Sequence, residues 1–174
     1  MDVAASEFFK DGKYDLNFKG DKPELKSGDE MIEIYKDFVN KYNLISIEDP
    51  FDQDDWTSYA KLTAAVGKQV QIVGDDLLVT NPKRIKEGIA KKSSKAILIK
   101  PNQIGTITKT QETVKYAQKH DIVPVISHRS GETCDTLISH LAVGWKIPFI
   151  KTGTVSGERL AKLNELIFIE KLLD

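Results

Sequence analysis

Five short apolar runs of the sequence each end in residues that can pair with a charge, bind a metal or transfer a proton. The terminal residues are Glu48, Asp75, Lys100, His128 with Arg129, and Lys151. They recur every 23 to 28 positions, and a further run at the N-terminus carries Asp2. In barrel enzymes, catalytic residues at the carboxyl ends of parallel strands meet at one mouth. The spacing therefore predicts one active site built from successive strand ends.

Asp2, Glu48 and Asp75 are three carboxylates that this pattern brings to neighbouring strand ends. Like charges at one mouth repel one another unless a cation lies between them. Carboxylate oxygens that leave room for water or substrate suit Mg²⁺. We therefore expect these residues to bind Mg²⁺, although each one alone is equally well explained as a strand-terminal acid that faces solvent.

The remaining strand ends supply cations and hydrogen-bond donors. A lysine such as Lys100 or Lys151, placed beside a bound cation and a second lysine, loses its proton more readily and can act as a base. Arg129 and Ser130, next to His128, form a natural phosphate clamp. The simpler alternatives are lysines whose ammonium groups reach the solvent at the rim, and a packed histidine.

These groups together define a reaction class. It is removal of a proton next to a metal-bound carboxylate, through an ene-diolate intermediate. A metal would neutralise the charge that develops on the carboxylate oxygens. Because a proton at that position is only weakly acidic, we expect this stabilisation to supply most of the catalysis.

The elements that must position these residues alternate along the chain. Strands are expected at residues 1–5, 44–48, 70–75, 96–100, 123–129 and 148–151. Helices are expected from residue 27 or 29 to 42, at 56–66, from 82, and at about 108–119, 132–143 and 158–173. Residues 7–28 indicate an irregular insertion with a short hairpin around residues 14–18, and the strand that ends at Lys100 runs into residues 101–105.

Strand–helix alternation predicts a parallel sheet with right-handed crossovers. A doubly wound sheet usually carries a glycine-rich phosphate loop, and no G-x-G-x-x-G follows the first strand here. We therefore favour an α/β fold with six of the eight β/α units of a TIM-type barrel. A closed barrel of this type usually has about 250 residues.

Bulk composition excludes several classes of partner. The 174 residues, 40% hydrophobic and 29% charged, fit one globular domain. A net charge of −1 gives no field that attracts nucleic acid. The apolar runs are too short for a membrane span, and no signal-peptide pattern opens the chain. Together with the single Cys134, these features predict a cytoplasmic protein.

Several segments closely resemble enolase, the glycolytic phosphopyruvate hydratase. They are residues 1–8, 46–51, 74–77, 79–84, 102–105, 127–133 and 150–153. The Ser-His-Arg-Ser-Gly-Glu-Thr motif at residues 127–133 is highly specific, and the likeness extends from Asp2 to about Glu170. The resemblance implies that residues 1–174 form the C-terminal enolase barrel domain without its first two strands and without the family's N-terminal domain.

The resemblance also implies roles for the strand-end residues. Asp2, Glu48 and Asp75 resemble the ligands of Mg²⁺, and the last two also face the substrate. Lys100 resembles the base that removes the C2 proton of 2-phosphoglycerate. The substrate-binding residues would be Lys151, which contacts the carboxylate, and His128, Arg129 and Ser130, which lie at the phosphate. The product is phosphoenolpyruvate, and the family usually forms homodimers.

Two departures from the family pattern and two alternative functions follow from the same resemblance. In the family, the first two barrel strands carry the general acid and the loop that binds a second Mg²⁺. Residues 1–174 do not include these strands, so we expect little activity from residues 1–174 alone. Phe168 replaces an arginine at the usual dimer contact, which argues against the standard dimer although a homo-oligomer stays open. The alternatives are a non-catalytic binding or structural module derived from enolase, and a superfamily member that acts on another carboxylate.

Overall fold

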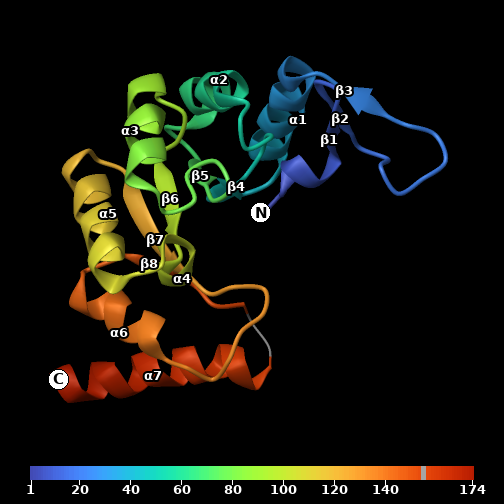
Figure 1. The fold of residues 1–174 in the computed structure, drawn as a ribbon. Helices are drawn as coiled ribbons and strands as arrows, with labels where there is room; N and C mark the ends of the chain where they lie inside the picture. Colours follow the sequence, from blue (N-terminus) through green and yellow to red (C-terminus); the bar gives the residue numbers. More distant parts are fainter. Residues whose placement is uncertain (154–155) are drawn as a thin grey trace.

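The fold is an open, curled parallel sheet with helices on its outer side (Figure 1). A computed structural model describes residues 1–153 and 156–174. Within these residues the sheet has five strands in the order β4-β5-β6-β7-β8, and every neighbouring pair is parallel. The strands are β4 (Ser46–Glu48), β5 (Gln71–Gly74), β6 (Ala96–Ile99), β7 (Val123–Ser127) and β8 (Phe149–Lys151). The α/β class and the partial TIM-type barrel are confirmed.

Helices follow the strands in the predicted alternation. They are α1 (Gly28–Lys41), α2 (Trp56–Val66), α3 (Pro82–Lys91), α4 (Pro101–Ile104), α5 (Ile107–Lys119), α6 (Leu137–Gly144) and α7 (Gly157–Leu173). Ser27 caps α1 in a reciprocal capping box with Glu30, and Asn81 caps α3 ahead of Pro82. These caps satisfy amide groups that the first turn of a helix leaves without partners, so the sequence determines where both helices begin.

The N-terminal segment differs from its prediction. Instead of a full strand, only Asp2 forms a parallel bridge, to Glu48 of β4. Ala4 then takes a left-handed conformation with φ 48°, and the 3₁₀ helix η1 (Ala5–Phe8) begins. The insertion forms a small antiparallel sheet from β1 (Phe9–Lys10), β2 (Lys13–Asp15) and β3 (Leu25–Lys26). The first hairpin turns before Tyr14, between β1 and β2, and the second turns after Asp15, between β2 and β3.

Two helices also depart from the pattern. Residues 101–105, for which the sequence predicted no helix, contain the single-turn helix α4, and its C-cap residue Gly105 has φ 95°. Helix α6 begins five residues later than predicted, at Leu137. The Glu132 carboxylate accepts hydrogen bonds from the backbone N–H groups of Arg129 and Thr133. It therefore stabilises a turn where the hydrophobic pattern predicted a helix.

The core lies between the outer face of the sheet and the helices. Ile47, Ile72 and Ile97 are fully buried there, alongside a cluster of aromatic side chains that includes Phe51 and Tyr59. The inner face carries Val73, Ala96 and Leu98, and partly buried valines pack against them. In a complete barrel such a face is filled by side chains from all eight strands.

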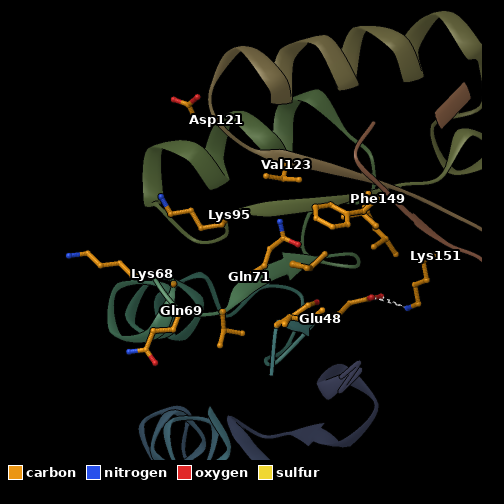
Figure 2. A pocket seen from close by; sticks show the side chains of 16 residues that line it. Glu48, Lys68, Gln69, Gln71, Lys95, Asp121, Val123, Phe149 and Lys151 are labelled. Atoms are coloured by element: carbon orange, nitrogen blue, oxygen red, sulfur yellow. Dashed lines mark hydrogen bonds and ion pairs between the residues drawn. The ribbon is translucent and has the colours of Figure 1, made fainter. Parts of the chain in front are cut away.

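Here the inner face lines an open hollow of about 660 Å³ (Figure 2). Lys151 and Glu48 stand at one end of it, and Lys68 and Lys95 at the other. Phe149, on the inner side, is 52% exposed.

Among the described residues, no helix combines the length and the apolar character that crossing a bilayer requires. Phe168 is 55% exposed on α7.

Burial in this core predicts the cost of truncating an isoleucine. Ile97→Ala should lower the free energy of unfolding by about 2–5 kcal/mol, because it leaves a cavity beneath the central strand. The matched substitution Ile107→Ala, at a 44% exposed position of α5, should change it by no more than about 0.5 kcal/mol. Urea denaturation of both variants measures the difference, and equal losses would contradict the placement of Ile97.

Candidate active site

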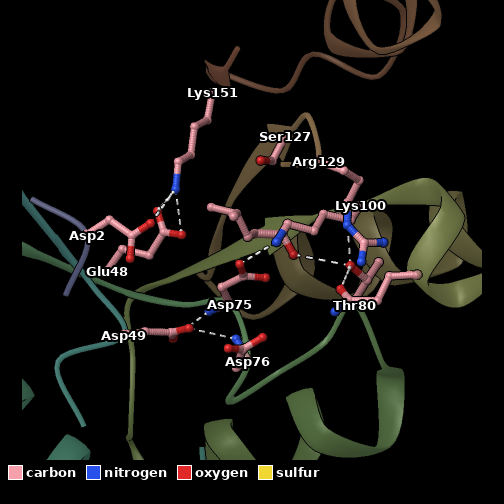
Figure 3. A network of polar contacts seen from close by, with 12 residues as sticks. Asp2, Glu48, Asp49, Asp75, Asp76, Thr80, Lys100, Ser127, Arg129 and Lys151 are labelled. Atoms are coloured by element: carbon pink, nitrogen blue, oxygen red, sulfur yellow. Dashed lines mark hydrogen bonds and ion pairs between the residues drawn. The ribbon is translucent and has the colours of Figure 1, made fainter. Parts of the chain in front are cut away.

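The predicted functional residues lie at one edge of the sheet because the five strands are parallel (Figure 3). Glu48 and Lys151 are the last residues of β4 and β8, and Asp75, Lys100 and His128 directly follow β5, β6 and β7. In a parallel sheet the carboxyl ends of all strands face the same side, so residues far apart in sequence meet there. The structure therefore brings the strand-end charges together.

Lys151 joins two of the three predicted metal ligands. Its Nζ donates to Asp2 Oδ2 at 2.9 Å and to both carboxylate oxygens of Glu48 at 2.8 Å. Burial raises the pKa of Glu48 to about 7, although the Lys151 ammonium opposes the rise. Burial lowers the pKa of Lys151, but its hydrogen bonds to Glu48 and Asp2 outweigh this effect, and the net shift is upward.

Asp75 and Lys100 form the second charged pair of the site. The Lys100 ammonium donates to Asp75 Oδ2, and both side chains are largely buried. Asp75 Oδ1 is buried as well, and within the described part of the chain it has no hydrogen-bond partner. A buried carboxylate oxygen normally has a hydrogen-bond partner, so Asp75 Oδ1 is suited to act as a ligand of a cation.

Thr80 holds the backbone of Lys100. Its hydroxyl oxygen accepts a hydrogen bond from the Lys100 N–H at 2.9 Å, and its carbonyl accepts one from Thr113 Oγ1 at 3.1 Å. Thr80 and the preceding Val79 both have positive φ, 54° and 43°. Such a conformation is strained for β-branched residues and persists only where the surroundings enforce it. The strain is thus located beside the candidate base.

Two further acids, Asp49 and Asp76, lie next to Asp75 of this pair. Oxygens of Asp49, Asp75 and Asp76 all lie within 4.8 Å of one another. Burial raises the pKa of Asp49 to about 6, and it also raises the pKa of Asp76. Asp49 differs from the other two because its oxygens accept hydrogen bonds from backbone N–H groups and from a tyrosine hydroxyl.

The His128–Arg129–Ser130 segment is held by the first turn of α7. The Arg159 guanidinium contacts His128 Nδ1 and donates to the carbonyl oxygens of Arg129 and Ser130, each at 3.0 Å. Burial lowers the pKa of His128, and the positive charge of Arg159 lowers it further. A donor at Nδ1 leaves the proton of the neutral imidazole on Nε2.

The same helix also supports the end of this segment. Lys162, 1% exposed, donates from Nζ to the Thr133 carbonyl at 2.8 Å and lies 3.8 Å from a Glu132 oxygen. Arg129 itself donates to Asn102 Oδ1 at 3.0 Å, and Ser130 is exposed. A guanidinium and a hydroxyl are therefore displayed at the mouth of the sheet, where an anion can reach them.

Four residues with clear structural roles at the site were not predicted as site residues from the sequence. They are Asp49, Thr80, Arg159 and Lys162. Asp49 and Thr80 lie within the segments 46–51 and 79–84, which resemble enolase. Arg159 and Lys162 lie on a helix whose apolar pattern gives no indication of a polar contact with another element.

Removing the Arg159 charge should change the titration of His128. In an Arg159→Met variant the pKa of His128 should rise toward its ordinary value of 6.5, because a nearby cation no longer disfavours protonation. A pH titration of the His128 ring signals by NMR measures the shift. Lys171→Met, which removes a charge from the last turn of the same helix, should leave that pKa unchanged. An unaltered His128 titration in Arg159→Met would contradict the contact.

Comparison with known proteins identifies the family. The family model described as "Enolase, C-terminal TIM barrel domain" matches residues 1–174. The chain is 57% identical to an enolase of Solanum lycopersicum and 53% identical to enolase 2 of Hevea brasiliensis, in each case over 178 aligned positions. Each alignment covers 99% of this chain but only 40% of the relative. Motifs, fold and relatives agree, and the chain belongs to the enolase family.

Proposed function

We propose that the strand-end site performs enolase chemistry, the dehydration of 2-phospho-D-glycerate to phosphoenolpyruvate in glycolysis and gluconeogenesis. The observation that carries this proposal is the pairing of two lysines with three carboxylates at one edge of the sheet. Such an arrangement provides a base, a carboxylate-binding cation and oxygen ligands within one site. The residues after β7 add a phosphate-binding surface beside it.

Asp2, Glu48 and Asp75 are the residues that would hold Mg²⁺. The fit rests on the unpartnered, buried Asp75 Oδ1 and on the oxygen-rich character of the set. When bound, the cation would neutralise the negative charge that builds up on the substrate carboxylate. Lys151, which contacts Asp2 and Glu48, would bind that carboxylate through its ammonium.

Lys100 is the proposed base that removes the C2 proton. An ammonium group paired with Asp75 cannot accept a proton, so Lys100 must lose both this partner and its own proton before it reacts. The electron pair of the broken C2–H bond moves onto the substrate carboxylate, which becomes an ene-diolate. Its return forms the C2–C3 double bond as the C3 hydroxyl takes up a proton and leaves as water. Arg129 and Ser130 would bind the phosphate, with His128 beside them.

Loss of the C3 hydroxyl needs a proton donor, which the family resemblance assigns to segments that this chain does not match. We propose that residues 1–174 act as an incomplete C-terminal barrel domain, and that turnover also requires those segments. A cytoplasmic location follows from the glycolytic reaction. A homo-oligomer other than the standard enolase dimer fits the exposed Phe168.

Magnesium binding tests the proposed site directly. Isothermal titration of the chain with Mg²⁺ should give saturable binding, and Asp75→Asn should weaken it at least about tenfold by removing a buried anionic ligand. Asp37→Asn, on the exposed side of α1, should leave the affinity unchanged. Saturable binding is not expected of a non-catalytic structural module, so its absence would favour that alternative.

A turnover assay tests the incompleteness of the site. The purified 174-residue chain, supplied with 2-phosphoglycerate and Mg²⁺, should form phosphoenolpyruvate at a small fraction of the rate of a full-length enolase assayed in parallel. The reason is that the general acid belongs to the segments that this chain does not match. General acid catalysis typically raises a rate on the order of 10²–10⁴-fold, and we expect the rate to be lower by a similar factor. A rate similar to that of the full-length enzyme would contradict the proposal.

A further inference from the structure

The carboxylate of Asp49 joins the ends of two strands of the active site (Figure 3). Its Oδ1 accepts a hydrogen bond from the Asp75 N–H at 2.8 Å, and its Oδ2 accepts one from the Asp76 N–H, also at 2.8 Å. Asp49 directly follows β4, whereas the two amides directly follow β5. The side chain therefore fixes the backbone that carries a proposed metal ligand.

These hydrogen bonds begin where the regular sheet ends. The last paired residues of the two strands are Glu48 and Val73, after which the Asp49 N–H donates to the Val73 carbonyl at 3.1 Å. Beyond this point, the described residues show no further ladder bond between β4 and the turn after β5, and the Asp49 carboxylate supplies the next two links. Hydrogen bonds to an ionised acceptor are stronger than neutral ones. The position of Asp75 thus depends on a side chain of the neighbouring strand.

The backbone of Asp49 is adapted to this role. Its φ is 42°, in the left-handed region that few residues other than glycine adopt readily. Aspartate tolerates this region better than most side chains because its short polar group bonds locally. A glycine would adopt the same backbone more easily but would have no carboxylate, so both the conformation and the side chain favour aspartate at this position.

Tyr59 anchors the carboxylate from the opposite side. Its hydroxyl donates to Asp49 Oδ1 at 2.8 Å, and its fully buried ring packs against Phe51 with centroids 5.5 Å apart. The hydroxyl is thus held by α2, which packs on the outer face of the sheet. Two hydrogen bonds thus link this helix, through the Tyr59 hydroxyl and the Asp49 carboxylate, to the backbone N–H of Asp75.

Direct metal binding by Asp49 is the competing interpretation, since its oxygens lie near those of Asp75 and Asp76. Both Asp49 oxygens already accept hydrogen bonds, three in all, and the residue is 5% exposed. By contrast, Asp75 Oδ1 is buried without a partner within the described residues. We propose that Asp49, anchored by Tyr59, is a positioning residue that holds Asp75 ready to bind the cation. This inference rests on the proposed function.

The test compares Asp49→Asn, Tyr59→Phe and a matched control in the 174-residue chain. The control is Asp52→Asn, because Asp52 also accepts a backbone N–H, that of Asp54 at 3.0 Å, but does not reach β5. Asn at position 49 replaces one acceptor oxygen by an NH₂ group that faces a backbone N–H. Phe at position 59 removes the anchor but keeps both acceptors, so it provides a milder second variant.

Amide hydrogen exchange followed by NMR without Mg²⁺ gives the first readout. In Asp49→Asn the amides of Asp75 and Asp76 should exchange at least about tenfold faster, while the Ile72 amide within β5 keeps its protection. Tyr59→Phe should show a smaller increase at the same two amides, and Asp52→Asn none. Unchanged exchange at Asp75 and Asp76 in a folded Asp49→Asn variant would overturn the inference, as would a uniform increase along β5. If Asp49→Asn does not fold, the Tyr59→Phe result decides in the same way.

Calorimetric titration with Mg²⁺ gives the second readout. Substituting a group that orients a metal ligand typically lowers metal affinity about 10–100-fold, and this loss is expected for Asp49→Asn. Equal affinities of Asp49→Asn and the unmodified chain would overturn the positioning role while leaving the proposed function intact. Absence of Mg²⁺ binding by the unmodified chain would instead contradict the proposed function, and with it the part of this inference that concerns the metal.

Discussion

The structure of the site depends on the pairing of opposite charges at the carboxyl edge of the sheet. Lys151 pairs there with Asp2 and Glu48, and Lys100 pairs with Asp75. Glu48, Asp75 and Lys100 are largely withdrawn from water, whereas Asp2 is exposed. A charge removed from water is strongly unfavourable unless a partner compensates it. Each lysine therefore compensates carboxylates at the edge of the sheet where we propose that a cation binds.

This pairing is possible only because the strands are parallel. Lys151 and Asp2 are 149 positions apart, and they meet because β8 and the N-terminal residues both end at the same edge of the sheet. Backbone contacts outside the ladder then refine the arrangement. Thr80, which itself lies in a strained turn, fixes the backbone of Lys100. Arg159, on a separate helix, holds the carbonyl groups of Arg129 and Ser130. The part of the site around Lys100 and the part around His128 are thus held by different elements.

The sheet itself remains open. Its inner face lines a hollow of about 660 Å³, with Phe149 half exposed, whereas the outer face is covered by helices. A barrel derives its stability and its mouth from closure of all its strands. The chain spans 40% of the length of the relatives it matches. The half-barrel that it forms carries Lys100, the proposed base, whereas the proposed general acid lies outside the matched segment.

The sequence by itself determined the five strands of the sheet, the order of the helices and the family. A period of 23 to 28 residues and local caps such as Ser27 and Asn81 depend on neighbours along the chain, so they can be recognised without a structure. Local pattern failed where a polar side chain overrode it, as Glu132 does at the predicted start of α6.

Only the tertiary structure decided which charges meet and what holds them. Asp49 contacts the Asp75 amide 26 positions away, and Arg159 reaches His128 from 31 positions away. Such contacts depend on the twist and register of the sheet and on how the helices pack, and neither is encoded in hydrophobic periodicity. The candidate residues could thus be predicted one by one, whereas their partners depended on the three-dimensional arrangement of the strands.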